Sequence, residues 1–299
     1  MDLTAALPTF IVTLREGFEA ALVVGIVIAC LQKAQQTQLY RWVYFGVIVG
    51  ILASIGVGVI LANTVRSLET AGGIYAPVIK QILAASFGLI AIAMLSWMLL
   101  WMSKQARSIK GEMQSAIDNA LSNNNAGTGI FLLVFIAVLR EGFETVLFIL
   151  AKFQESWFFP ITGAVAGLIL AGVMGWLLFA IGIKIKIRLF FQIMGVLLLL
   201  IVGGLVLSAS YHFDQFALLL SELSTNNWCF GDSSSCLLGI QIWDGSMLLS
   251  DKTFPGIILK ALFGYRQTLY LIQIIVYFAF LVLVGSAYWT SITQQRIKN

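Results

Sequence analysis

The chain has 299 residues, of which 60% are hydrophobic and only 11% are charged. Soluble domains average about 45–50% apolar and 25% charged residues, so this composition, with a mean hydropathy of +0.94, excludes a soluble globular protein. The formal net charge of +4 comes from basic residues that are scattered over the connections between apolar segments. That distribution excludes the clustered basic surface of a nucleic-acid-binding protein.

Seven apolar segments are each long enough to cross about 30 Å of hydrocarbon as a helix. They lie at 9–31, 42–62, 77–102, 129–151, 159–183, 189–210 and 268–291. The sequence therefore predicts an all-α polytopic membrane protein with about seven transmembrane helices. Because no Lys or Arg precedes the first segment, we expect it to be kept as a helix and not removed as a signal peptide.

Lys and Arg are distributed unevenly between the two sides of the predicted membrane. If the N-terminus lies outside, ten of these residues fall on inner segments and six on outer ones. Cytoplasmic loops carry the excess of Lys and Arg in membrane proteins, so the count predicts an N-out, C-in orientation.

The hexapeptide Leu-Arg-Glu-Gly-Phe-Glu occurs twice, at 14–19 and at 139–144, inside the first and fourth apolar segments. A charged residue at the centre of a spanning helix costs roughly 2.5–3.5 kcal/mol on translocon-type scales, and ionisable residues at that depth are functional-site candidates by default. The second copy lies three segments after the first, an odd offset, so the two motif helices cross the membrane in opposite directions. A duplicated three-helix unit of this kind is an inverted-topology repeat, with its binding site near the midplane.

Glycine spacing in the second and fifth segments supports the duplication. Gly46, Gly50 and Gly58 recur with the same spacing as Gly163, Gly167 and Gly175. The predicted organisation is a first three-helix repeat over 1–110, a cytoplasmic connector over 111–128, a second repeat over 129–211, an extracytoplasmic loop over 212–267, and a seventh helix with a cytoplasmic tail over 268–299.

Within one motif the charged side chains share a helix face, because residues one, three and four apart fall within about 100° of one another. The first copy places Arg15, Glu16 and Glu19 on that face, with Gly17 between them to let a neighbouring helix approach. The second copy repeats the arrangement with Arg140, Glu141, Gly142 and Glu144. If the faces meet, four carboxylates and two guanidinium groups carry a formal charge of −2, which a hard divalent or trivalent cation would offset and which proton uptake by a Glu would reduce.

Other interpretations of the motifs remain open at this point. Each copy could be an Arg–Glu clamp between helices, or the site could bind sodium or protons without transporting a metal. An intramembrane metal-binding sensor or enzyme, or a transporter of another divalent cation, would use the same carboxylates. The chain has no phosphate-binding loop of the Walker type, so we do not expect it to hydrolyse ATP.

The doubled Arg-Glu-Gly-Phe-Glu motif resembles the oxidase-dependent iron permease family, which includes the fungal high-affinity iron permease and the bacterial Efe-type iron uptake permease. Segments 211–215, 242–244 and 262–266 also resemble the bacterial members, although Phe213 stands where they usually carry a Glu. The resemblance implies a transporter, not an enzyme, that imports Fe(III) or Fe(II) across a plasma membrane or a bacterial inner membrane. It implies Glu16, Glu19, Glu141 and Glu144 as translocating metal ligands, Arg15 and Arg140 as essential neighbours, and an extracytoplasmic ferroxidase or iron-delivery protein as partner. We expect no prosthetic group, and the sequence does not fix the oligomeric state.

The predicted outer loop offers a second place for metal chemistry. His212 and Asp214 directly follow the sixth segment and are the best candidates for an entrance site, although a solvated acidic loop would look much the same. Cys229 and Cys236 lie seven residues apart in this loop. They could form a disulfide if that side of the membrane is oxidising, or remain two free thiols.

Overall fold

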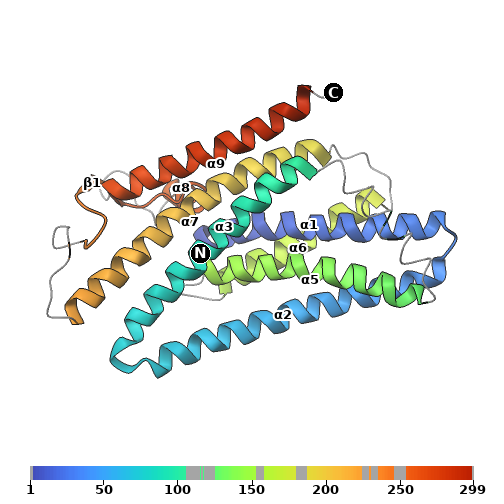
Figure 1. Cartoon of the computed structure of the whole chain (residues 1–299), viewed down its shortest axis with the longest axis horizontal. Helices are drawn as coiled ribbons and strands as arrows, with labels where there is room; N and C mark the ends of the chain where they lie inside the picture. The colour runs from blue at the N-terminus through green and yellow to red at the C-terminus, as the bar shows by residue number, and fades with distance from the viewer. Residues whose placement is uncertain are drawn as a thin grey trace.

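The protein is built from long α-helices (Figure 1). The structure is a computed structural model that describes residues 3–105, 115, 117, 125–152, 158–179, 187–223, 229, 235–245 and 254–297. The helices are α1 (Leu3–Lys33), α2 (Tyr40–Ala71), α3 (Ala76–Gln105), α5 (Ala126–Lys152), α6 (Phe158–Phe179), α7 (Ile187–Leu223), α8 (Gly256–Phe263) and α9 (Leu271–Ile297). Short 3₁₀ turns, Thr37–Leu39 and Gly73–Tyr75, connect α1 to α2 and α2 to α3. Most of the predicted connector at 111–128 lies outside the described residues.

Among the described residues, five helical segments are long and apolar enough to cross a membrane. They are Thr37–Leu68, Ala76–Trp101, Phe158–Phe179, Leu189–Leu223 and Leu271–Thr293. Helices α1 and α5 have 31 and 27 residues, enough for about 46 and 40 Å at 1.5 Å per residue, but both carry the charged motifs. The chain is therefore an all-α membrane protein, as predicted, whereas the count of seven spans and the orientation stay predictions.

The helices form two groups that cross obliquely in Figure 1. In one group α1 packs along α6 and α2 packs along α5, and α1 and α5 meet at its centre. In the other, α3, α7 and α9 lie side by side. A core of buried apolar side chains joins the groups, with Val12 of α1, Leu95 of α3, Phe148 of α5 and Leu205 of α7 among its members. This core holds the two motif helices firmly in place.

Close contacts at glycines show the direction of each helix pair. Along α1 and α6, Ala6 faces Gly163 and Ala21 faces Gly175, so residue numbers rise together and the two helices are parallel. Along α2 and α5, Gly46 faces Val134 and Gly58 faces Val146, so this pair is parallel too. Since the short turn at Thr37–Leu39 makes α1 and α2 antiparallel, α1 and α5 run in opposite directions, as the two motifs predict.

Helix α7 ends later than the sequence indicated. We expected the chain to leave the sixth span at residue 211 and enter a loop, but α7 continues to Leu223. The reason is local: no Gly or Pro occurs between 205 and 223, and the apolar run 216–220 continues the helix. The expected loop at 212–267 also contains β1 (Gln241–Asp244), paired antiparallel with β2 (Thr268–Tyr270), and the short helix α8.

Candidate metal centre

The first motif copy is almost completely buried in the middle of α1. Arg15, Glu16 and Glu19 have exposed fractions of 3%, 1% and 8%. Arg15 Nη1 donates a hydrogen bond of 2.9 Å to Glu16 Oε1, and Arg15 Nη2 lies 3.0 Å from Glu19 Oε1. The second contact is an ion pair without hydrogen-bond alignment, because Glu19 Oε1 has no hydrogen-bond partner among the described residues. One arginine thus neutralises part of the charge of two buried carboxylates.

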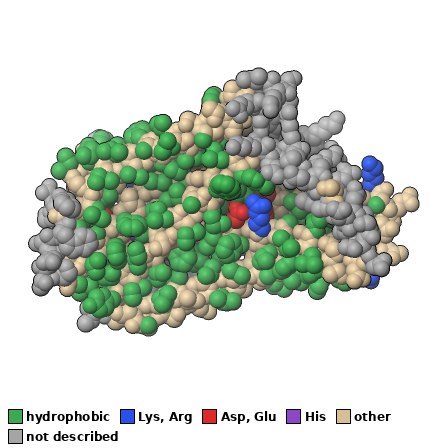
Figure 2. Space-filling view, viewed as in Figure 1, with side chains coloured by type: hydrophobic (Ala, Val, Ile, Leu, Met, Phe, Trp, Pro, Cys, Tyr) green, Lys and Arg blue, Asp and Glu red, His purple; other side chains and the backbone are tan. Residues whose placement is uncertain are grey.

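The second copy is more open. Glu144 is buried, Glu141 is half-buried, and the Arg140 side chain is 49% exposed. Arg140 Nε lies 3.3 Å from Glu144 Oε1, a longer contact than either arginine contact in the first copy. On the face drawn in Figure 2, basic and acidic side chains come to the surface together amid hydrophobic ones.

Carboxylates from both motif helices converge. One oxygen from each of Glu16, Glu141 and Glu144 lies within 4.8 Å of the others. Ligand oxygens bind hard cations at about 2.0–2.6 Å, so two oxygens on opposite sides of one ion stand about 4–5 Å apart. Glu16 Oε2, Glu141 Oε2 and Glu144 Oε2 are buried without a hydrogen-bond partner among the described residues. The three side chains therefore offer acceptors that a single cation could satisfy.

Glu19 does not belong to this three-residue set. The sequence predicted four converging carboxylates, whereas the structure brings three together and pairs the fourth with Arg15. Glu16 and Glu19 both contact Arg15, so the ion pair does not separate them; the difference lies in their positions along α1, where Glu19 is three residues, or about 4.5 Å, beyond Glu16.

Gly17 and Gly142 lie at the closest approach of the motif helices to their neighbours. A Cβ atom on Gly17 would stand 2.9 Å from the Ala171 side chain of α6, and one on Gly142 would stand 2.6 Å from Cβ of Ser54 on α2. Neither helix pair has room for a larger residue at these positions.

Helix α3 contacts both arginines, a role that the sequence did not reveal. Arg15 Nη1 donates to Met98 Sδ at 3.4 Å, and the Arg140 guanidinium lies over the Trp101 ring, 5.1 Å from its centroid. Both residues belong to an apolar segment, where Met and Trp look like ordinary core or lipid-facing side chains. No pattern in the sequence distinguishes them.

The chain matches the sequence profile of the iron permease FTR1 family over residues 6–289. It belongs to that family. The permease is 49% identical over 291 residues to an uncharacterized protein from Synechocystis sp., a match that covers 97% of this chain and 94% of the relative. It is 29% identical over 275 residues to the ferrous iron permease EfeU of Escherichia coli O6:K15:H31, with 91% of each chain covered. It is 30% identical over 277 residues to EfeU of Yersinia pestis, covering 91% of this chain and 89% of the relative. No solved structure matches.

Family membership settles the broad class that the motifs predicted. The protein is a multi-pass transporter of the plasma membrane or a bacterial inner membrane, not an enzyme, and iron is its transported substrate.

In this permease the predicted entrance residues have internal partners. Asp214 is 1% exposed, and its Oδ1 accepts hydrogen bonds from Ser235 Oγ and from the backbone N–H groups of Cys236, Leu237 and Leu238, at 2.6–3.2 Å. His212 is 5% exposed, and its Nδ1 contacts Gln81 Oε1 of α3. Both residues lie within α7 and not in a loop. Because Asp214 is buried and its Oδ1 binds the chain near residue 236, it anchors that segment and is not available as an exposed metal ligand.

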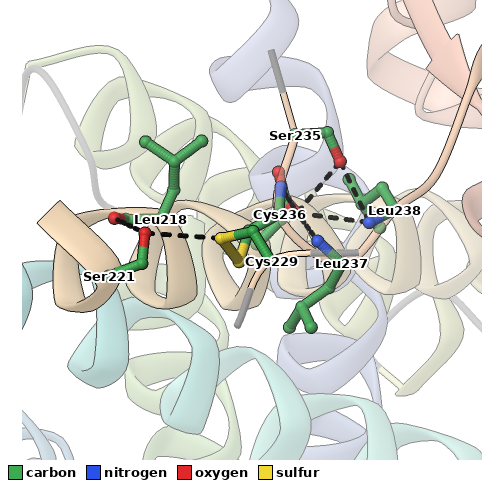
Figure 3. Close-up of a disulfide and its surroundings, with 8 residues drawn as sticks. Leu218, Ser221, Cys229, Ser235, Cys236, Leu237 and Leu238 are labelled. Atoms are coloured by element: carbon green, nitrogen blue, oxygen red, sulfur yellow. Dashed lines mark hydrogen bonds between the residues drawn. A yellow bond between two sulfur atoms is a disulfide. The ribbon is translucent and has the colours of Figure 1, made fainter. Parts of the chain in front are cut away.

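Cys229 and Cys236 are joined by a disulfide (Figure 3). Cys229 Sγ also lies 3.3 Å from Ser221 Oγ near the end of α7. Together with the hydrogen bonds to Asp214, the disulfide fixes the segment at residues 235–238 against the last turns of α7.

Proposed function

We propose that this permease imports iron through a site at the α1–α5 interface in which Glu16, Glu141 and Glu144 bind the ion. The observation that carries the proposal is the convergence of three carboxylates from antiparallel helices, each with a buried oxygen that has no hydrogen-bond partner among the described residues. Burying acceptors in this way is costly unless a ligand satisfies them.

Charge balance favours a divalent ion. With all groups ionised, the four motif glutamates and two arginines carry a formal charge of −2, which one Fe(II) ion offsets. Carboxylate oxygens suit such a cation. The relatives from Escherichia coli and Yersinia pestis are named ferrous iron permeases, and we extend that substrate to this chain. Glu19, held by Arg15 one turn away, would serve as the next ligand along the path.

The site lies within two related three-helix units. Gly46, Gly50 and Gly58 of α2 all contact α5, and Gly163, Gly167 and Gly175 of α6 all contact α1. These equivalent contacts support an inverted repeat of α1–α3 and α5–α7 about an axis through the α1–α5 contact. In transporters with this plan, one repeat moves against the other around a central site, and we assign the same motion to this chain.

The disulfide supports the orientation that the charge distribution predicts. Disulfides persist on the oxidising side of a membrane, so the end of α7 would face outward. With α7 pointing outward, the N-terminus is outside, the C-terminus is inside, and iron arrives from an extracytoplasmic delivery protein or ferroxidase.

Uptake by sealed vesicles tests the proposal. Purified protein in liposomes is supplied with radiolabelled Fe(II) under reducing, anaerobic conditions, or with Fe(III)-citrate, and accumulated iron is counted. We expect native protein to accumulate Fe(II), Glu141→Gln to abolish accumulation, and Glu222→Gln, at an exposed position on α7, to leave it unchanged.

Two results would contradict the proposal. Native-level iron uptake by folded Glu141→Gln would favour the alternative in which each motif is only an Arg–Glu clamp between helices. Iron binding without accumulation in native vesicles would instead favour a sensor.

A further inference from the structure

The two motif arginines have the same sequence neighbours but different surroundings. The Arg15 side chain is 4% exposed and lies against two carboxylates of its own helix, whereas that of Arg140 is 49% exposed and contacts Glu144 only through Nε. The repeat itself therefore does not determine where each guanidinium group lies. Helix α3, which is not part of either motif, contacts both guanidinium groups but with a different side chain at each.

Met98 and Trp101 of α3 stand three residues apart, so they share one face of that helix. Met98 contacts Arg15, and Trp101 lies under the guanidinium of Arg140 at 5.1 Å. A guanidinium within about 6 Å of an indole ring is attracted to its face, and Trp is the strongest aromatic partner. The Arg140 guanidinium group therefore has two favourable contacts, one with the Trp101 ring and one with the Glu144 carboxylate.

The position of Arg140 matters because its charge competes with a metal ion. Glu144 contributes to the three-carboxylate cluster and is also the ion-pair partner of Arg140. A guanidinium that moved further over the cluster would occupy its free oxygens, as bidentate Arg–carboxylate pairs do. Attraction to Trp101 holds the guanidinium to one side.

From this geometry we infer that Trp101 is a positioning residue that keeps Arg140 beside the carboxylate cluster and thereby sets how tightly the site binds iron. The inference rests on the proposed function, since it concerns the same site. Trp101 acts through Arg140 and does not touch the ion.

The experiment measures Fe(II) binding to purified protein by anaerobic equilibrium dialysis, and uptake kinetics in vesicles. Trp101→Leu removes the ring, and we expect it to weaken Fe(II) binding and raise the KM for uptake roughly two- to fivefold, with little change in the maximal rate. Trp97→Leu is the matched control, because Trp97 lies on the same helix with 74% of its surface exposed and should leave both quantities unchanged.

A double-variant cycle separates positioning from packing. In Arg140→Gln there is no guanidinium to hold, so adding Trp101→Leu should not weaken Fe(II) binding further. Trp101→Phe keeps a smaller aromatic ring and should weaken Fe(II) binding less than Trp101→Leu does. If Trp101→Leu folds poorly, Fe(II) binding by Trp101→Phe still tests the inference.

The outcomes distinguish this inference from the proposed function. Unchanged Fe(II) binding in Trp101→Leu, or equal weakening with and without Arg140, would overturn the positioning role while leaving the site intact. Unchanged Fe(II) binding in Glu141→Gln would instead show that the proposed site is wrong, whatever Trp101 does.

Discussion

Arg15 and Arg140 differ in what each would lose on substitution by Lys. Arg15 is buried and contacts Glu16, Glu19 and Met98 at once, which requires the planar fork of a guanidinium group. A lysine there keeps the charge but reaches fewer acceptors. Arg140 is half exposed, so water can take over part of its contacts.

We therefore expect Arg15→Lys to be the more damaging of two chemically identical changes. It should lower the free energy of unfolding by about 1–3 kcal/mol, whereas Arg140→Lys should cost less than about 1 kcal/mol. Thermal unfolding of both variants in the same detergent measures the difference. Equal losses would show that the two arginines have equivalent surroundings.

Asp214 provides a prediction away from the metal centre. Its Oδ1 accepts hydrogen bonds from one hydroxyl and three backbone N–H groups, and an amide oxygen in the same place accepts more weakly than a charged carboxylate oxygen does. Asp214→Asn should lower the free energy of unfolding by about 1.5–3 kcal/mol. Iron uptake per folded molecule should stay near the native rate. A selective loss of uptake without a loss of stability would return Asp214 to the role of an entrance ligand.

At the scale of helices, glycines decide how closely the paired helices approach. On α6, a Cβ atom at Gly167 would stand 2.7 Å from the backbone oxygen of Phe10 on α1, whereas one at Gly172 would meet nothing within 4 Å. On α2, Gly50 faces Val138 of α5 at 2.9 Å, and Gly56 likewise meets nothing within 4 Å. Each repeat thus offers a crowded glycine and an uncrowded one on the same helix.

Alanine substitutions at the crowded and uncrowded glycines test how closely the helices approach. Gly167→Ala and Gly50→Ala should each destabilise the protein by about 1–3 kcal/mol, because the extra methyl group forces the helices apart. Gly172→Ala and Gly56→Ala should be neutral or slightly stabilising, since Ala favours helix more than Gly does. Thermal stability of the four variants tests this, and a destabilised Gly172→Ala or Gly56→Ala would argue against the helix pairing described here.

Sequence reasoning worked where the signal was repeated or periodic. Two identical hexapeptides in the first and fourth apolar segments predicted antiparallel motif helices, and the charges within these two segments predicted the meeting of Glu16 with Glu141 and Glu144. It could not place Glu19 outside the cluster, because Glu16 and Glu19 lie on one helix face and only side-chain geometry separates them. Trp101 was not predictable either, since its role depends on where α3 crosses α5.

The end of α7 shows a different limit. The predicted boundary followed the fall in hydrophobicity near His212 and Asp214, but a polar residue does not end a helix when its side chain finds partners inside the protein. Hydropathy locates the membrane-crossing part of a helix and not the full helix.

For the whole molecule, the orientation predicts which positions reach the outside. In a background of Cys30→Ser, where Cys229 and Cys236 are bonded, Glu222→Cys near the end of α7 should react with a membrane-impermeant maleimide on intact cells. Thr37→Cys, between α1 and α2, should react only after the membrane is made permeable. Both positions are exposed in the structure, so the opposite pattern of labelling would reverse the proposed topology.

The most direct test of the central claim is to locate the ion. A structure of the permease with bound Fe(II), determined from diffraction data at the iron absorption edge, should show one anomalous peak within bonding distance of Glu16, Glu141 and Glu144, and the peak should vanish in Glu141→Gln. Iron bound elsewhere, with these three carboxylates making no contact to it, would contradict the account.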